Sequence, residues 1–189
     1  MCAPLDQAPP TLADAIGRAH CWSEDALTTP GREVLTSVWW LSTHLAAVDR
    51  VVHPVAIETW ADGPAAVAEQ RRRAAEIVRL LWTLDHSVSG DARLHGPVSG
   101  VVRRLAALVR EHAEAEDALV AELEARLPDA LLGLVRRRYS DMVRRAPTRP
   151  HPATAGRPRL AAAAFRIEGV VDHLRDVVDG RGAPRRLAG

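Results

Sequence analysis

Apolar residues recur at steps of three and four along most of this chain, which is the pattern of helices that bury one face. The clearest example is the segment VVRRLAALVREHAEAEDALVAELEARL, residues 101–127. Its apolar stripe continues through His112 and Glu116. Side chains four residues apart stand one above the other on a helix, so this imidazole and this carboxylate are predicted to point together toward the interior. They either face a buried ligand or satisfy each other.

A second copy of this pattern lies 68 positions earlier in the chain. When LSTHLAAVDRVVHPV is set beside VREHAEAEDALVAEL, His44 lies over His112 and Asp49 lies over Asp117. In the first copy, Val48 stands at the position that matches Glu116, the carboxylate four residues after His112 in the second copy. The repeat predicts two helices that present similar faces to one interior, and the missing carboxylate makes the two copies unequal.

The remaining helical patterns are separated by Pro and Gly. Thr11 followed by Asp14 predicts a capping box that starts a short helix, and SEDALTTPG predicts the loop after it. A long helix that begins near Arg32 carries His44, and Pro54 should kink or end it because proline lacks an amide donor and crowds the preceding turn. Further helices are expected at about 64–87, 128–145 and 158–179.

These patterns predict an all-α protein with one globular domain. Strand signals are weak, and 189 residues with 47% hydrophobic content suffice for one sizeable core. The run APTRPHPATAGRP contains four prolines and predicts a strap without regular structure. The expected order is a flexible N-terminus (1–10), the helical bundle (11–145), the Pro-rich strap (146–157), a C-terminal amphipathic helix (158–179) and a flexible tail (180–189).

Composition argues against several classes of function. The formal net charge of +1 does not suit a dedicated nucleic-acid binder. Cys2 and Cys21 are too few and too poorly placed for a disulfide framework or a thiolate metal cage. The N-terminus lacks a secretory pattern, and no apolar run approaches the roughly 20 residues of a membrane span. We therefore expect a cytoplasmic protein with neither nucleic acid nor membrane as a partner.

Isolated polar residues on the predicted helices have simpler interpretations. Gln70 interrupts the apolar row of the helix expected at 64–87, so its side chain should face the interior and need a partner. His20 is interpreted as a helix-end residue and His53 as a surface or turn residue. His151, in the strap, is interpreted as structural.

The two overlaid segments resemble the hemerythrin-like HHE cation-binding domain family. That family is a four-helix bundle of two similar halves, in which the second and fourth helices each carry a His followed by acidic residues four or five positions later. His112, Glu116 and Asp117 with LVAEL match it closely, and His44 and Asp49 with VVHPV match it in part. APTRPHP is also similar to a segment that follows the bundle in actinobacterial-type members. Over residues 10–155, the resemblance implies an up-down four-helix bundle with additional N-terminal or C-terminal helices.

The resemblance also implies a non-haem metal site with a degenerate ligand set. A complete di-iron site of this kind draws on about five histidines and two carboxylates. Gln70 stands where a histidine of the third helix would be expected. The implied ligands are His44, His112 and Glu116, with Asp49, Asp117 and His20 as further candidates. The expected cofactor is iron, with one ion or none per chain.

Three functions are compatible with this pattern. The first is a hemerythrin-like protein whose iron binds or senses a small gaseous ligand (oxygen or nitric oxide) or peroxide. The second is a metal-free bundle that serves as a protein-interaction or regulatory subunit. The third is a di-iron-type oxidoreductase, which requires open coordination positions and a substrate pocket. The apolar face expected on the C-terminal helix must be buried against the bundle or against a second subunit, as in a homodimer.

Overall fold

A computed structural model describes residues 9–28, 33–88, 98–152, 168–169, 171–172 and 176. All regular structure in these ranges is helical, which confirms the all-α prediction. The elements are α1 (Leu12–Thr28), α2 (Glu33–Ala47), the π-helical turn η1 (Val48–Val52), α3 (His53–Thr59), α4 (Gly63–Val88), α5 (Val98–Arg126) and α6 (Asp129–Val143).

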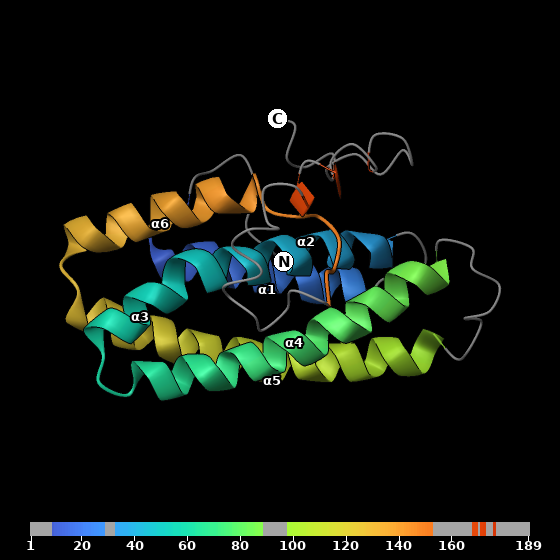
Figure 1. Ribbon diagram of the computed structural model, residues 1–189, viewed down its shortest axis with the longest axis horizontal. Helices are drawn as coiled ribbons and strands as arrows, with labels where there is room; N and C mark the ends of the chain where they lie inside the picture. Colours follow the sequence, from blue (N-terminus) through green and yellow to red (C-terminus); the bar gives the residue numbers. More distant parts are fainter. Residues whose placement is uncertain are drawn as a thin grey trace.

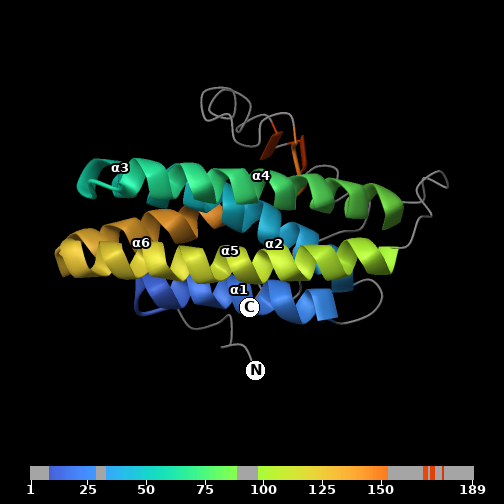
Figure 2. The same cartoon turned by 90° about the horizontal axis from the view of Figure 1, so that it is seen from below.

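Four long helices form a bundle in which each packs against its neighbours along the chain. α1 contacts α2, α2 contacts α4, α4 contacts α5, and α5 closes the ring against α1. Consecutive long helices run in alternating directions along the long axis of the molecule (Figure 1). α6 lies outside this ring and packs mainly against α2 and η1, as the two views together show (Figure 2).

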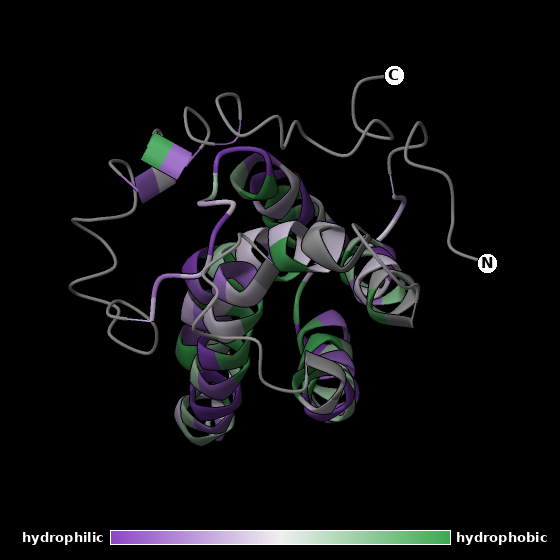
Figure 3. Cartoon of the chain, turned by 90° about the vertical axis from the view of Figure 1, so that its right-hand side faces the viewer, coloured by the Kyte–Doolittle hydropathy of each residue, from purple (hydrophilic) through white to green (hydrophobic). Residues whose placement is uncertain are grey.

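Each helix of the bundle carries both hydrophobic and hydrophilic residues, as the view along the helices shows (Figure 3). Burial of the hydrophobic faces produces two apolar clusters. One cluster includes Leu12, Ile16, Val52, Val67, Val120 and Leu123. The other includes Leu27, Leu41, Ile77, Leu81, Leu105 and Val109.

A layer of buried polar residues lies between the two apolar clusters. Along α1, α4 and α5, a polar position separates the residues of one cluster from those of the other, and on α2 His44 lies close to the boundary between them. These positions are His20 on α1, His44 on α2, Gln70 on α4, and His112 and Glu116 on α5. The prediction that Gln70 faces the interior is confirmed, since its exposed fraction is 3%. We refer to these five residues as the polar layer.

The start of α1 and the turn before α4 follow from local sequence. The N–H of Thr11 donates to Asp14 Oδ2 at 3.2 Å, and the N–H of Asp14 donates to Thr11 Oγ1 at 3.0 Å, so the predicted capping box is confirmed. Gly63 begins α4 directly against the carbonyl of Ala56, and a Cβ at this position would collide with that oxygen. Only glycine permits so close a turn between α3 and α4.

The prediction of a loop at SEDALTTPG is wrong for residues 23–28, because α1 continues to Thr28. Ser23 does not break the helix, since its hydroxyl donates to the carbonyl of Ala19 at 2.8 Å within the same helix. Leu27 is buried in the second apolar cluster and holds the extra turns against the bundle. The longer helix places His20 in the middle of α1, so the helix-end interpretation of this residue is wrong.

Pro54 does not end the helix that carries His44. α2 passes into η1, where the N–H of His53 donates to the carbonyl of Val48. α3 then starts with Pro54 in its first turn, where the missing proline N–H leaves no helical hydrogen bond unmade. A π-turn adds a residue to the helix, so positions after Val48 are rotated relative to those before it.

The described part of the strap is held by hydrogen bonds and ion pairs with acidic side chains from the C-terminal part of the chain. Residues 146–152 contain no helix. The N–H of Arg149 donates to Asp172 at 3.1 Å, and its Nε donates to Asp176 at 3.2 Å. His151 Nε2 lies 2.8 Å from the same Asp172. The helix predicted over 158–179 lies mostly outside the described residues. Within this range the structure describes 168–169, 171–172 and 176, and all of these are helical.

No helix in the described ranges is both long enough and apolar enough to cross a membrane. Cys21 on α1 is disulfide-bonded, and the only other cysteine of the chain, Cys2, lies outside the described residues. Disulfides are rare in a reducing cytoplasm, so this bond lends no support to the cytoplasmic expectation.

Candidate metal centre

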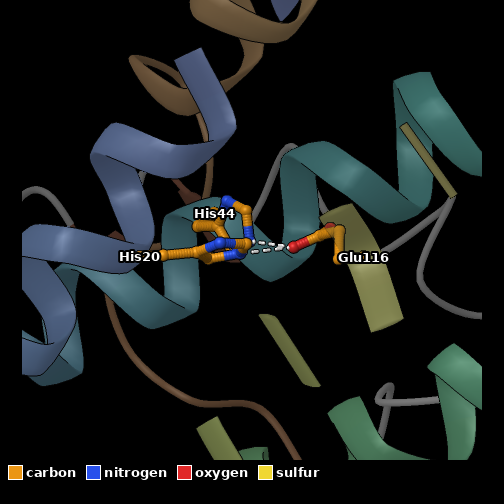
Figure 4. Close-up of side chains that lie close together, drawn as sticks. All are labelled: His20, His44 and Glu116. Atoms are coloured by element: carbon orange, nitrogen blue, oxygen red, sulfur yellow. Dashed lines mark hydrogen bonds and ion pairs between the residues drawn. The ribbon is translucent and has the colours of Figure 1, made fainter. Parts of the chain in front are cut away.

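Two histidines of the polar layer, His20 and His44, converge on a single carboxylate oxygen of Glu116 (Figure 4). His20 Nε2 lies 2.6 Å from Glu116 Oε2, and His44 Nε2 lies 2.8 Å from the same atom. One nitrogen from each ring and one oxygen from the carboxylate all lie within 4.8 Å of one another. The two imidazole rings meet edge to face, with centroids 5.0 Å apart. Residues separated by up to 96 positions therefore share one point of the interior.

Helix packing brings these three side chains together. Ile16 precedes His20 by one helical turn on α1, and Leu41 precedes His44 by about one turn on α2; both apolar residues are buried. Their burial turns the same faces of α1 and α2, with the histidines, toward α5. α5 contacts α1 directly, so Glu116 reaches both imidazoles. His20, His44 and Glu116 lie on the same helix faces as the buried apolar residues, so burial of those faces also places these polar side chains inside the bundle.

Glu116 is held in its ionised form. Burial by itself would raise the pKa of this carboxyl, but the neighbouring imidazoles of His44 and His20 outweigh burial and hold the pKa well below its ordinary value of 4.5. Glu116 Oε2 accepts from both rings, whereas Oε1 is buried and has no hydrogen-bond partner in the part of the chain that the structure describes. An unpartnered carboxylate oxygen in the interior is a position that a cation or a water molecule would stabilise.

Tyr139 on α6 completes the surroundings of His44. Its hydroxyl lies 2.7 Å from His44 Nδ1. Burial and the nearby charge of Glu116 raise the pKa of Tyr139 well above its ordinary value of 10, so the phenol keeps its proton. With Nε2–H donating to Glu116, His44 Nδ1 is the atom that accepts the phenolic O–H. Sequence reasoning missed this residue because no spacing relates Tyr139 to His44, although it is the only tyrosine of the chain.

His112 is as deeply buried as the other candidates but is bonded to none of them. Its exposed fraction is 3%, and neither ring nitrogen has a hydrogen-bond partner among the described residues. Burial is the main reason that the pKa of His112 is lowered to about 4; the charge of Glu116 opposes this shift, and the nearby imidazoles add to it. The alternative that His112 and Glu116 satisfy each other is therefore wrong, because Glu116 turns toward α1 and α2.

The remaining candidates lie around the cluster. Asp49 Oδ1 accepts from Arg71 Nε at 2.7 Å and lies 3.2 Å from His53 Nδ1. Burial alone would raise the pKa of Asp49, but these two partners lower it below its ordinary value. Asp117 has a side chain that is 64% exposed and an oxygen 3.6 Å from His20 Nδ1. The surface interpretation of His53 is wrong: its exposed fraction is 2%, because the π-turn rotates it inward.

The cluster offers the donor types of a mixed nitrogen and oxygen metal site. Two imidazoles with one carboxylate form the set that binds non-haem ferrous iron and leaves coordination positions open. Metal ligands must be deprotonated, so an ion bound here would take the place of the protons that now join Glu116 to His20 and His44. The residues present therefore fit a single transition-metal ion.

No protein-family model, curated protein or solved structure matches this chain. The resemblance to the hemerythrin-like family thus rests on the two overlaid segments. The case for a function rests on the site itself.

Proposed function

We propose that this protein binds one divalent transition-metal ion, iron foremost, through His20, His44 and Glu116. The observation that carries the proposal is that two imidazoles, from two helices, converge on one oxygen of a buried carboxylate from a third helix. Iron held by two histidines and one carboxylate keeps open positions for small ligands. The proposed role is to bind or sense such a ligand, with oxygen, nitric oxide and peroxide as the candidates that the hemerythrin-like resemblance implies.

The surrounding residues would hold the ligands in place. Tyr139 fixes the ring of His44 through Nδ1, which is the position that an outer partner of a metal-binding imidazole usually takes. The second oxygen of Glu116 is available to the same ion. The apolar clusters on both sides exclude bulk water, which strengthens electrostatic interactions inside the site. Iron itself would supply the affinity for the small ligand.

The donor inventory supports one ion and not two. The slot four residues after His44 is Val48, and the third-helix position is Gln70, neither of which is a strong iron ligand. Asp49 is paired with Arg71 and His53, away from the cluster. A second iron would have to rely on His112 with little help from neighbouring residues. This argues against the di-iron-type oxidoreductase.

A second candidate function is favoured by one observation. Glu116 Oε2 already accepts two hydrogen bonds without an ion, and these two imidazoles stabilise its charge and hold its pKa below the ordinary value. Buried hydrogen bonds of this kind can specify the alignment of helices in the absence of metal. On this alternative the protein is a metal-free interaction or regulatory subunit.

Metal loading separates the two functions. The purified protein is stripped with a chelator, loaded anaerobically with ferrous iron, freed of excess ion and analysed for iron content. We expect one iron per chain in the wild type and little in His20→Ala or His44→Ala. His86→Ala is the matched control, because His86 Nδ1 lies against the carbonyl of Trp82 at the end of α4, and it should bind as the wild type does. No bound metal under any loading condition would establish the metal-free alternative.

A further inference from the structure

A groove lies between α6 and the segment formed by η1 and α3. α6 packs mainly against α2 and η1 and makes little contact with α3, so the two sides of the groove separate along α3 (Figure 1). The groove has a volume of about 640 Å³, with η1 and α3 on one side and α6 on the other. His20, His44 and Glu116 are not part of its wall, so the groove is distinct from the candidate metal site.

The α6 side of the groove is an apolar strip. It consists of Leu131, Leu134, Val135 and Met142, and steps of three, four and seven residues place these side chains on one face of α6. Val135 is buried, whereas Leu134 and Met142 are half-buried and Leu131 is 40% exposed. Few large apolar side chains among the described residues are as exposed as Leu131. An apolar strip that the fold leaves partly uncovered favours contact with another apolar surface.

Two arginines without partners stand beside the apolar strip. Arg138 and Arg145 line the groove and are exposed, and neither side chain forms an ion pair or a hydrogen bond with another described residue. Asp141, which also lines the groove, is already paired with Arg144. The α6 side therefore combines apolar contact area with two unpaired positive charges.

The opposite side of the groove contributes one unpaired negative charge. Glu58 on α3 is exposed and forms no ion pair within the described ranges of the chain. Arg50 on η1 has the charges of Asp49 and Glu168 nearby, and these offset its own charge. An occupant with acidic groups toward α6 and no acidic group toward α3 would therefore match the charges on both sides.

We propose that this groove binds an amphipathic α-helix of a partner protein. The apolar face of that helix lies on the apolar strip, and its acidic residues lie beside Arg138 and Arg145. From Leu131 to Met142 α6 rises roughly 16 Å, at about 1.5 Å per residue, so about three turns of the partner helix cover the strip. A small molecule fits less well, because small-molecule sites enclose most of their ligand and both sides of this groove carry exposed residues.

The chain's own C-terminal tail does not have the composition of this occupant. Residues 180–189 contain three arginines and no acidic residue, so their charge does not complement the arginines of α6. The groove therefore fits a helix from another protein. This inference goes beyond the metal site and does not depend on it.

Fluorescence anisotropy with labelled peptides and the full-length, chelator-treated protein tests the proposal. The probes are designed amphipathic helices of about four turns, with Leu or Phe at steps of three and four residues and Glu beside them. The control probes carry Lys in place of Glu. At physiological ionic strength we expect at least one Glu peptide to bind saturably and the Lys peptides not to bind.

A pair of charge reversals on α6 locates the binding. Arg138→Glu should weaken binding of the Glu peptide about tenfold or more, because it places like charges together. Arg137→Glu is the matched control, since Arg137 is exposed on the same helix but does not line the groove. The control makes the same change in net charge and should alter the affinity less than about twofold, because salt screens exposed charges that make no direct contact.

A pair of apolar substitutions tests the strip itself. Leu131→Ser should weaken binding about tenfold, since it removes an apolar contact from the groove. Ile57→Ser is the matched control: Ile57 is 38% exposed, close to the 40% of Leu131, but it does not line the groove. Both are surface substitutions, so the fold should persist, and circular dichroism checks this.

Four results would overturn the proposal. The first is no saturable binding by any Glu peptide, and the second is an equal loss in Arg137→Glu and Arg138→Glu, which indicates diffuse attraction to a basic helix. The third is binding to phosphatidylserine vesicles but not to peptides, with loss in Leu131→Ser, which makes the groove a membrane-facing surface. The fourth is a dimer in sedimentation that Leu131→Ser dissociates, which assigns the groove to a second copy of the chain. Since the protein is free of metal throughout, none of these results bears on the metal site.

Discussion

His44 and His112 occupy matching positions in two similar segments, yet their surroundings are opposite. His44 Nδ1 meets the hydroxyl of Tyr139, and His44 Nε2 meets Glu116. His112 is almost as buried, yet both its nitrogens lack partners in the described ranges. The repeat in the sequence therefore predicts which helix face is buried, but it does not predict which partner meets that face.

Two features of the first segment explain the difference. α6 packs mainly against α2 and η1, and this packing places the hydroxyl of Tyr139 within hydrogen-bonding distance of His44. The π-turn at Val48–Val52 then rotates the following residues, and Asp49 turns toward Arg71 and His53. α5 has no such turn, since it is α-helical from Val98 to Arg126. The two segments are similar in sequence, yet their side chains make different tertiary contacts.

The largest predicted difference between the two segments concerns stability without metal. Glu116→Ala removes the acceptor of two buried imidazoles, so it should lower the free energy of unfolding by about 3–5 kcal/mol. His112→Leu replaces an unpartnered ring and should cost much less, because no described residue loses a hydrogen bond. Urea denaturation of the metal-free variants measures both values. A similar loss in the two variants would show that the contrast between the segments has no energetic basis.

The pH dependence of stability should identify His112 specifically. Its pKa is lowered from 6.5 to about 4, so between these values the unfolded chain takes up a proton that the folded chain does not. Stability is therefore lost as the pH falls from 6.5 toward 4, and this residue accounts for about 3 kcal/mol of the loss. Denaturation of the metal-free protein at several pH values should give a shallower slope for His112→Leu than for the wild type. Identical slopes would mean that the imidazole is solvated or finds a partner.

A smaller effect is expected from the outer partner of His44. Tyr139→Phe keeps the aromatic ring and removes the hydroxyl, which should cost about 1 kcal/mol of stability. The same change should weaken metal binding by about 10-fold to 100-fold, since the ring of His44 is no longer oriented. Competition with a chelator of known affinity gives the second quantity. A variant that loses stability but keeps full metal affinity would place Tyr139 outside the metal site.

The smallest effect should follow from Gln70→Leu. Gln70 is buried, and its Oε1 has no partner within the residues that the structure describes. Exchange for an apolar residue of similar size should change stability by less than about 1 kcal/mol. Thermal unfolding followed by circular dichroism measures the change. A large loss would assign Gln70 a hydrogen-bonding role in the polar layer.

The sequence was most informative about helices and buried faces. The steps of three and four placed His44, His112, Glu116 and Gln70 in the interior, because helical periodicity depends on local geometry alone. The capping box at Thr11 was equally local. These features depend on residues within one or two turns of each other.

The details of the site depend on tertiary contacts that periodicity does not contain. Ser23 and its neighbours predict a loop, and this places His20 at a helix end. In the structure Ser23 bonds within the helix and Leu27 packs in the core, so α1 is longer and His20 lies in its middle. The proline after His53 predicts a surface or turn position for this histidine, but the π-turn accommodates the proline and the histidine is buried. Tyr139 comes from a helix outside the repeat, and no pattern within the repeat indicates it.

X-ray absorption at the iron edge of the iron-loaded protein tests the central claim most directly, because it counts the ligands of the ion. The proposed site predicts scattering from two imidazoles, those of His20 and His44, together with oxygen ligands and no neighbouring iron atom. His44→Ala should reduce the imidazole scattering to that of one ring or prevent loading, and His112→Leu should leave the spectrum unchanged. A spectrum with three or more imidazoles, with a second iron nearby, or with no imidazole at all would contradict this account.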